Sequence, residues 1–500
     1  MQDVLVIGGG IAGLVAARSC ARLGLGVTVI EAADAVGGPV AGHDVAGLRL
    51  DSGAESFAVR GGTVAAFIEE LGLTTEIVAP NPAGAWLHLP ALMGGQGPVS
   101  VPLPQAGVLG IPGSPLADDV RAVIGWGGAL RAYLDRLMPV LTIGREHSLG
   151  DLVAKRMGRR VLERLVEPVA SGVYTTSSRD LEVDVVAPGL NRALTTTGSL
   201  SGAVLALRSG APAGSAVGGL RGGMSSLPAA LVAELEHFGA VIETGRSATR
   251  LARIDAPDDI EQGWAVTLAP PAAESDDDES DDESDNADTG DVLRTARFVI
   301  VATQGRQALR LLAPLGDAHD ALSELDWPAP TAVTLVTLVL DAPGLDTHPR
   351  GTGVLVAAEA TDVTAKALTH VTAKWSWVAA AAGVGQHVVR LSYGRAGQPN
   401  PVEGLADDEL EALALRDAST LLGTPLSAGM LRGCARTEWR DAISPATIGA
   451  PERASSVRDA LADTPGLEVT GAWLAGTGLA SVIPDALAAA SRIRQASLGL

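Results

Sequence analysis

The chain has 500 residues, which is more than one hydrophobic core usually supports, so its length predicts about two to four domains. Hydrophobic residues make up 47% of the chain, enough apolar material for several buried cores. The formal net charge of −21 would repel a phosphate backbone and therefore argues against nucleic acid as a partner.

A buried parallel strand is predicted at the N-terminus, where Val4–Ile7 form a continuous apolar run. Gly8–Gly13 then fit the pattern G-x-G-x-x-G, and a helix is predicted over about 11–23. A second strand, Val27–Ile30, ends on Glu31, where an acid can accept hydrogen bonds from an adenosine ribose. Strand, helix, strand and acid in this register predict a dinucleotide-binding unit.

Each glycine of this loop has its own expected task. Gly8 allows the tight turn, Gly10 lets the backbone approach a pyrophosphate, and Gly13 permits close packing of helix on strand. The pyrophosphate is expected at the helix N-terminus, because the N–H groups there are free and the helix dipole is positive. Such a unit binds NAD or FAD, so the loop alone leaves both cofactors open.

The residues after Glu31 favour FAD. Glu31 and the pair Gly37 and Gly38 together resemble the second fingerprint of flavin amine-oxidase-like enzymes, in which the glycine pair passes close to FAD. Ala35 stands where that family usually has Arg or Lys, and this departure removes an expected phosphate contact.

The next segments are predicted from periodicity and from turn residues. A short strand near 47–51 precedes a helix that Thr63 is expected to cap. Residues 80–116 are rich in Pro and Gly and are expected to be irregular. From about 118 to 168 the pattern is helical, with Ser148 as a cap. This helical segment is either a lid over the site or plain helix packing.

A helix is predicted at Leu227–Phe238, followed by short strands at 240–243, 264–268 and 298–302. The acidic stretch 274–291 cannot bury apolar surface, so it is predicted to be a solvated, disordered loop.

The following region is predicted to be β-rich, with strands at 331–340, 353–357, 372–378 and 388–393. A helix is expected near Asp407–Leu422. A glycine-rich stretch from Gly471 leads to the last helix, which is expected to begin near Pro484.

Cysteine usage and hydropathy exclude several classes of protein. Cys20 and Cys434 lie in no CxxC or Cys/His cluster, so the sequence predicts neither a disulfide framework nor a metal site. No apolar run approaches the ~18 residues of a transmembrane helix. The N-terminus lacks the basic region of a signal peptide, and a cytoplasmic location is expected.

At this point several segments together resemble the protoporphyrinogen/coproporphyrinogen oxidases of the haem pathway, especially the soluble Gram-positive type that oxidises coproporphyrinogen III. The likeness extends over nearly the full length. The pattern Glu-Pro-x-x-x-Gly-Val-Tyr, which begins at Glu167, discriminates best, because general amine oxidases lack it. The other segments are Gly8–Gly13 with Glu31, 51–57, 220–224, 438–440 with Ala442 and Pro445, and 471–485.

The resemblance implies an α/β fold with a Rossmann-like FAD-binding domain, a β-rich substrate domain and a helical domain. In relatives the helical domain covers the substrate cavity and can meet the membrane. The expected bounds are 1–79, 215–305 and 431–500 for the discontinuous FAD-binding domain, 80–110 and 306–430 for the substrate-binding domain, and 111–214 for the helical domain.

Flavin contacts carry over by resemblance, residue by residue. They are Gly8, Gly9, Gly10, Ile11, Ala12, Gly13, Glu31, Ala32, Gly37, Gly38, Gly53, Ala54, Glu55, Ser56, Ala248, Trp439, Gly471, Gly478, Val482 and Ile483. No residue is assigned as a catalytic acid or base. Arg60 is the candidate cation for the substrate's propionates, and its alternative is an ordinary surface arginine.

The implied reaction is the oxidation of coproporphyrinogen III to coproporphyrin III by hydride transfer to flavin N5, with dioxygen as acceptor and hydrogen peroxide as product. Three alternatives stay open: a protoporphyrinogen IX oxidase, another flavin amine oxidase-like enzyme, and a Rossmann-type binding protein without redox activity. The expected partners are the porphyrinogen and dioxygen, with transient contact to the next haem-pathway enzyme or a membrane surface.

Overall fold

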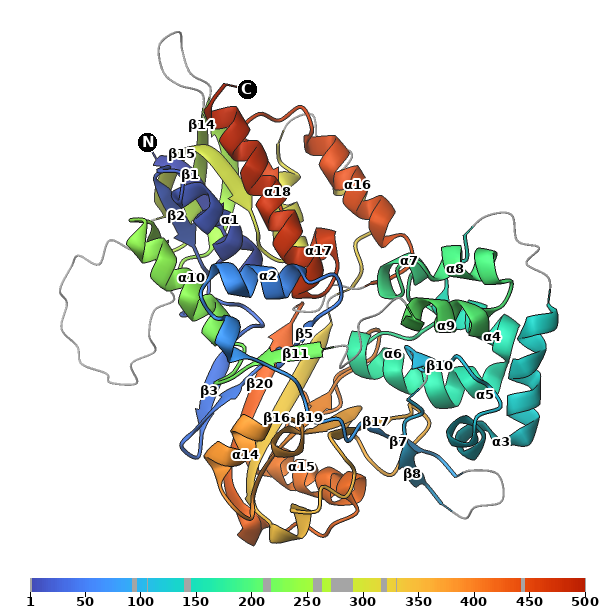
Figure 1. Cartoon of the computed structure of the whole chain (residues 1–500). Coiled ribbons are helices and arrows are strands. Elements are labelled where there is room, and N and C mark those ends of the chain that lie inside the picture. The colour runs from blue at the N-terminus through green and yellow to red at the C-terminus, as the bar shows by residue number, and fades with distance from the viewer. Residues whose placement is uncertain are drawn as a thin grey trace.

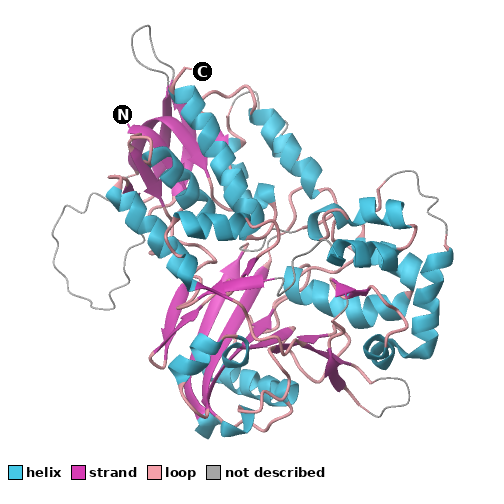
Figure 2. Cartoon of the chain, in the orientation of Figure 1, coloured by secondary structure: helices cyan, strands magenta, loops and turns pink. Residues whose placement is uncertain are grey.

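The computed structural model forms three lobes, and both termini lie in one of them (Figure 1). The structure describes residues 2–91, 97–105, 107–138, 145–209, 217–254, 263–270, 291–315, 322–329, 331–441 and 446–499. Ala442, Pro445 and the acidic stretch as far as residue 290 lie outside these ranges. Helices flank a sheet in the first lobe, a second large sheet forms another lobe, and the third lobe is mainly helical (Figure 2).

The first lobe is built on a sheet with the strand order β12–β2–β1–β15–β14–β13, and β21 also pairs with β15. The pairs β12–β2, β2–β1, β1–β15 and β15–β21 are parallel, whereas β14 pairs antiparallel with the first half of β15 and β13 pairs antiparallel with β14. The strands are β1 (Gln2–Ile7), β2 (Val27–Ile30), β12 (Val241–Glu243), β13 (Ala248–Ile254), β14 (Gly263–Leu268), β15 (Val292–Val301) and β21 (Leu467–Val469). The dinucleotide-binding topology predicted from the first residues is therefore present.

Helices cover both faces of this sheet, as in doubly wound α/β folds. One face packs against α1 (Ile11–Ala21), α2 (Thr63–Glu70), α10 (Ser226–His237) and α18 (Leu479–Ser497). The other face packs against α11 (Gly305–Leu312), α16 (Ala450–Leu461) and α17 (Ala472–Ala475). Cys20 is fully buried on α1.

Two helix boundaries in this lobe differ from the expectation. Helix α18 begins at Leu479, because Gly478 is its N-cap, and Pro484 lies inside the helix. Helix α2 begins at Thr63 itself, and Gly62, in a left-handed conformation with φ +70°, occupies the N-cap position. Thr63 is therefore the first helical residue and not the cap.

The second lobe contains a seven-stranded sheet in the order β20–β16–β19–β18–β17–β7–β8. Helix α15 (Asp407–Leu422), predicted with these bounds, packs on one face. The strands are β7 (Trp86–Leu89), β8 (Val99–Pro102), β16 (Ala332–Asp341), β17 (Gly353–Val356), β18 (Ala367–His370), β19 (Gln386–Tyr393) and β20 (Leu431–Arg440). The expectation of irregular structure over 80–116 was wrong: β7 pairs in parallel with β17, and Leu87 and Leu89 are fully buried.

The prediction of a strand at 372–378 was also wrong. These residues form parts of two short helices, α13 (Val371–Lys374) and α14 (Ser376–Ala382). Val371, Trp375 and Val378 recur at helical spacing and pack together against the second sheet. The β-branched and aromatic residues indicated a strand, but this burial pattern has a helical period.

The third lobe has a single core shared by its helices. Ser148 caps α4 as predicted, because its Oγ accepts the N–H of Asp151 at 3.1 Å. The helices are α3 (Asp118–Tyr133), η2 (Leu134–Leu137), α4 (Leu149–Met157), α5 (Arg159–Val161), η3 (Leu162–Val166), α6 (Glu167–Tyr174), α7 (Val183–Val186), α8 (Leu190–Thr197) and α9 (Leu200–Ser209).

Smaller elements complete the fold. In the part of the chain that the structure describes, no helix is long and apolar enough to cross a membrane. The remaining elements are β3 (Gly42–Val45), β4 (Leu48–Asp51), β5 (Phe57–Ala58), η1 (Thr74–Glu76), β6 (Ile77–Val78), β9 (Gly107–Val108), β10 (Ile111–Pro112), β11 (Val217–Leu220), η5 (Pro343–Leu345) and η6 (Ala428–Met430).

Candidate functional site

The glycine loop between β1 and α1 leaves no room for side chains at two positions. Gly8 has φ +110°, and a Cβ on it would lie 2.6 Å from the carbonyl oxygen of Ala302. A Cβ on Gly13 would lie 1.8 Å from the carbonyl oxygen of Gly8. The N–H of Gly8 donates to the Ile30 carbonyl at 2.8 Å, which fixes the loop on the sheet. Glycine is therefore required by the protein's own backbone at Gly8 and Gly13.

Gly10 differs from these two glycines, because its surroundings leave space. It is the N-cap of α1 and has no side chain to accept the N–H groups of the first turn. Among the described residues, no atom lies within 4 Å of the place where a Cβ on Gly10 would stand. This uncapped helix N-terminus, which begins with Ile11 and Ala12, fits a pyrophosphate that accepts hydrogen bonds from the backbone.

Glu31 lies beside the same loop and is held in place by backbone groups. Its Oε2 accepts the N–H of Gly9 at 2.7 Å, and its Oε1 accepts the N–H of Ala33 at 2.8 Å. Each carboxylate oxygen has a second lone pair, so both can accept a further hydrogen bond from a ribose hydroxyl. The neighbouring Ala32 is exposed.

The second glycine pair lies directly against the first loop. The N–H of Gly37 donates to the Gly9 carbonyl at 2.8 Å, and Gly37 forms a parallel bridge with Gly10. A Cβ on Gly38 would lie 3.6 Å from the Cα of Gly10. The two fingerprints recognised in the sequence thus form one continuous backbone surface, while Ala35 is exposed to solvent.

The turn that follows β4, residues 51–56, joins this surface. The N–H of Ala54 donates to the Pro39 carbonyl at 2.8 Å, and a Cβ on Gly53 would lie 2.1 Å from the same oxygen. Trp439, on β20 of the second sheet, donates its indole N–H to the Ser52 carbonyl at 2.9 Å. Segments far apart in the chain, among them residue 439, therefore meet at the turn.

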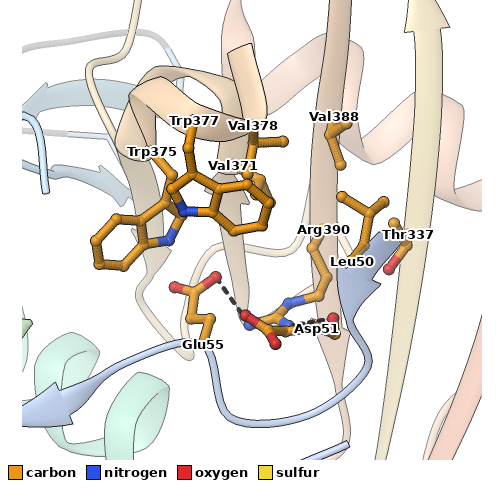
Figure 3. Close-up of a pocket in the computed structure, with 10 residues that line it drawn as sticks. All are labelled: Leu50, Asp51, Glu55, Thr337, Val371, Trp375, Trp377, Val378, Val388 and Arg390. Atoms are coloured by element: carbon orange, nitrogen blue, oxygen red, sulfur yellow. Dashed lines mark hydrogen bonds and ion pairs between the residues drawn. The ribbon is translucent and has the colours of Figure 1, made fainter. Parts of the chain in front are cut away.

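Four charged residues cluster at the seam between the first and second lobes: Asp51 and Glu55 of the turn, with Lys374 and Arg390 of the second lobe (Figure 3 shows Asp51, Glu55 and Arg390). Lys374 Nζ contacts Glu55 Oε1 at 2.5 Å, and Arg390 Nη2 contacts Glu55 Oε2 at 3.0 Å. Arg390 Nη1 donates to the carbonyl oxygens of Asp51 and Gly53 at 3.0 Å each. Two acids and two bases thus form one compact cluster.

Burial and pairing act in opposite directions on the two acids. Burial alone would raise the pKa of Glu55, but the positive charges of Lys374 and Arg390 outweigh burial and hold that pKa below its usual value. Burial raises the pKa of Asp51 to about 6, although the charge of Arg390 opposes the rise. Glu55 is therefore the ionised centre of the cluster.

A cavity of about 10 Å³ lies in this seam, enclosed by charged and apolar side chains (Figure 3). Such a volume has room for about one water molecule. The cavity is therefore too small to hold a flavin or a substrate, and its residues support the turn from behind. They are Leu50, Asp51, Glu55, Thr337, Val371, Trp375, Trp377, Val378, Val388 and Arg390.

The other predicted contact residues lie in the first lobe. Ala248 is the buried first residue of β13, two positions after Arg246, whose N–H donates to the Glu31 carbonyl at 2.9 Å. Gly471 and Gly478, with φ +126° and +109°, are the N-caps of α17 and α18. The side chains of Val482 and Ile483 are buried in the core shared with α1, and the N–H of Val482 donates to the Gly478 carbonyl at 3.1 Å within the helix.

Arg60, the candidate substrate cation, is exposed and lies near the end of the Glu-Pro motif in the helical lobe. Burial raises the pKa of Tyr174, the last residue of α6, and the positive charge of Arg60 opposes this rise. The structure thus brings Arg60 and Tyr174 within electrostatic range. In the described part of the chain, no group of three or more His, Cys, Asp or Glu is placed to hold a metal ion.

Sequence reasoning missed Lys374 and Arg390. Lys374 is one of only three lysines in the chain, and that rarity could have drawn notice to it. Arg390 interrupts the apolar run of β19, where an arginine buried among Val and Leu requires a partner. Neither signal names the partner, which lies more than 300 positions away in the chain.

The glycine loop at a helix N-terminus, the acid after the second strand and the second glycine pair together define a dinucleotide-binding protein. The family model described as "Flavin containing amine oxidoreductase" matches residues 11–494, and the chain belongs to this family. The protein is an FAD-dependent oxidoreductase. Gly10, the uncapped α1 and Glu31 fit this cofactor, which places its pyrophosphate and ribose at such groups.

Curated relatives match the chain over nearly its full length. The chain is 28% identical over 498 residues to a coproporphyrinogen III oxidase of Mycobacterium tuberculosis, covering 98% of this chain and 96% of that one. It is 26% identical over 505 residues to a coproporphyrinogen III oxidase of Bacillus subtilis, covering 98% and 97%.

Solved structures support the fold. A candidate protoporphyrinogen oxidase from Exiguobacterium has a TM-score of 0.78 at 24% identity, covering 100% of this chain and 99% of that one. Cyclohexylamine oxidase from Brevibacterium oxydans has a TM-score of 0.63 at 15% identity, covering 100% of both chains. The fold is therefore that of flavin amine oxidases, an α/β FAD-binding domain combined with further lobes.

Proposed function

We propose that the protein oxidises coproporphyrinogen III to coproporphyrin III. The observation that carries the proposal is the similarity to coproporphyrinogen III oxidases, which covers 98% of this chain and 96–97% of the relatives. The pattern that begins at Glu167, which general amine oxidases lack, favours this reaction over amine oxidation. Family membership as a flavin oxidoreductase argues against a binding protein without redox activity.

Bound FAD supplies a two-electron acceptor for each oxidation step. The proposed reaction has three such steps, in which the porphyrinogen loses six hydrogen atoms and three dioxygen molecules become hydrogen peroxide. The chain's own residues provide binding and orientation: the α1 N-terminus for the pyrophosphate, Glu31 for the ribose, and the turn 51–56 for the flavin side. Arg60 offers an exposed cation to a substrate propionate.

The direct test uses the purified protein with FAD and coproporphyrinogen III prepared without oxygen. We expect porphyrin fluorescence to appear on admission of air at a rate well above autoxidation, with one hydrogen peroxide formed per two electrons removed. Protoporphyrinogen IX is expected to react more slowly, because it has two propionates fewer.

The outcomes of this assay separate the alternatives. Faster oxidation of protoporphyrinogen IX would reassign the substrate within the same reaction class. No acceleration with either porphyrinogen would refute the proposal, and rapid bleaching of the flavin by an amine would then identify an amine oxidase.

We also propose that the helical lobe contacts a membrane surface. Trp126, Leu130 and Leu137 recur at helical spacing along α3 and η2, and Trp126 and Leu137 are 63% and 76% exposed. Arg121 lies over the ring of Trp126 at 4.1 Å, and Arg136 lies over Tyr133 at 5.2 Å. An apolar stripe flanked by arginines is typical of helices that lie on anionic lipid.

Co-sedimentation with vesicles tests this contact. The double substitution of Trp126→Ser and Leu137→Ser is expected to weaken binding to phosphatidylglycerol-containing vesicles about tenfold or more, because it removes two apolar side chains from the lipid. Val384→Ser, at a fully exposed residue of another lobe, should bind like the wild type. If the double variant binds the vesicles as well as the wild type does, or if the wild type does not bind them, the membrane proposal is refuted. The partner of this stripe would then be a protein, such as the next haem-pathway enzyme.

A further inference from the structure

The turn 51–56 is held from the second sheet through consecutive carbonyl oxygens. Arg390 binds the carbonyls of Asp51 and Gly53, and the indole of Trp439 binds the carbonyl of Ser52 between them. These side chains come from β19 and β20, which belong to another lobe. The turn cannot rotate about its backbone without breaking hydrogen bonds to that lobe.

The charge cluster fixes the geometry of Arg390 itself. Its Nη2 lies 3.0 Å from Glu55 Oε2, and the side chain of Glu55 is largely buried and also paired with Lys374. Figure 3 shows the guanidinium near Asp51 and Glu55, with Trp375 between the helices α13 and α14 and Trp377 on α14. A planar guanidinium can satisfy two carbonyls and a carboxylate at once, whereas a lysine ammonium is a single point of charge.

The front of the same turn faces the cofactor surface. Gly53 packs against the Pro39 carbonyl, and Pro39 follows the glycine pair that bridges to Gly10. A displacement of the turn therefore changes the backbone surface on which the flavin would lie.

We infer that Arg390 is a positioning residue for FAD: from the second lobe, it holds the turn 51–56 in the conformation that binds the flavin. The inference rests on the proposed placement of FAD at Gly53–Ser56. It concerns cofactor binding and is independent of which substrate the enzyme oxidises.

The test is the substitution Arg390→Lys, which keeps the positive charge beside Glu55 but cannot reach both carbonyls. We expect the Kd of the apoprotein for FAD, measured by quenching of flavin fluorescence, to rise about tenfold or more. The visible spectrum and the midpoint potential of the remaining bound flavin are expected to shift. A role in stability alone would lower the melting temperature of the apoprotein without changing the spectrum or the potential.

Arg432→Lys is the matched control. Arg432 lies on β20 of the same sheet, is exposed and pairs with Asp341. We expect it to leave the Kd, the spectrum and the potential unchanged. An unchanged Kd and spectrum in Arg390→Lys would overturn the inference.

A second variant decides the question if Arg390→Lys does not fold. Trp439→Phe keeps an aromatic side chain but lacks the indole N–H that binds Ser52, so it should raise the FAD Kd in the same direction. Wild-type affinity and spectrum in Trp439→Phe would then overturn the inference. These measurements are made without porphyrinogen. A failure of the inference about Arg390 can therefore be distinguished from a failure of the proposed oxidation.

Discussion

Replacing Gly13 by Ala is expected to abolish stable FAD binding and to destabilise the first lobe. The new Cβ would lie 1.8 Å from the Gly8 carbonyl oxygen, so β1 and α1 would have to move apart. Overpacking of this kind costs about 1–3 kcal/mol of unfolding free energy. Loss of two backbone hydrogen bonds to the charged pyrophosphate, at about 1.5 kcal/mol each, would raise the Kd for FAD by a factor on the order of 100.

Gly10→Ala is the informative partner of this variant. Gly10 has an ordinary φ of −68°, and no described atom lies within 4 Å of the position of its Cβ. The apoprotein should therefore tolerate alanine at Gly10, whereas the close approach of a pyrophosphate should not. We expect unchanged stability without FAD and at least about tenfold weaker binding of FAD.

Thermal denaturation of both apoproteins and titration with FAD check the pair. Loss of affinity in Gly13→Ala alone would show that the loop is needed for packing and that the pyrophosphate lies elsewhere. Destabilisation of the Gly10→Ala apoprotein would contradict the open space described at that position.

Asp135→Ala is expected to lower the unfolding free energy of the helical lobe by about 3–5 kcal/mol. Asp135 and Arg156 form a pair at 2.5 Å whose side chains are 0% and 6% exposed. Arg156 also donates to the carbonyls of Met138 and Gly198, and Asp135 accepts the N–H of Ser201. Removal of the carboxylate leaves a buried guanidinium without its counter-charge.

Asp151→Ala is the control for this prediction. Asp151 pairs with Arg179 on the same lobe, but its side chain is 64% exposed, and an exposed pair contributes about 1 kcal/mol or less. Hydrogen–deuterium exchange of α4 and α9 should accelerate in Asp135→Ala and not in Asp151→Ala, while FAD affinity stays unchanged in both. Similar exchange in the two variants would show that the Arg156 pair adds little to the stability of this lobe.

Local patterns predicted the parts of the fold that local interactions determine. The loop Gly8–Gly13 was recognisable because a tight turn and a close approach to another backbone exclude other residues. Helix Asp407–Leu422 was predicted with its observed bounds, since acids fill its first turn and Gly423 ends it in a left-handed conformation. Both signals lie within about twenty residues of chain.

The features that the sequence analysis missed depend on contacts between residues far apart in the chain or on packing that the residue types did not reveal. Strand β13 and the pairing of β7 with β17 depend on partners far away in the sequence, and residues 372–378 were misread because their β-forming side chains pack at helical spacing. The grip of Arg390 on the turn 51–56 joins positions more than 300 residues apart. The periodicity of a short segment cannot predict a contact between residues so far apart. The placement of FAD at the predicted residues stays a prediction.

Arg390 and Trp439 bind three carbonyl oxygens of the turn across the seam between the lobes. They therefore link the contact between the lobes to the binding of the cofactor. A cofactor that binds more tightly when the seam is closed must, by reciprocity, stabilise the closed seam by the same free energy. Holoenzyme and apoenzyme would then differ in how firmly their lobes adhere, and not only in what the glycine loop holds. A substitution that weakens the contact between the lobes is therefore expected to lower the affinity for the flavin, even when the substituted residue lies far from the flavin.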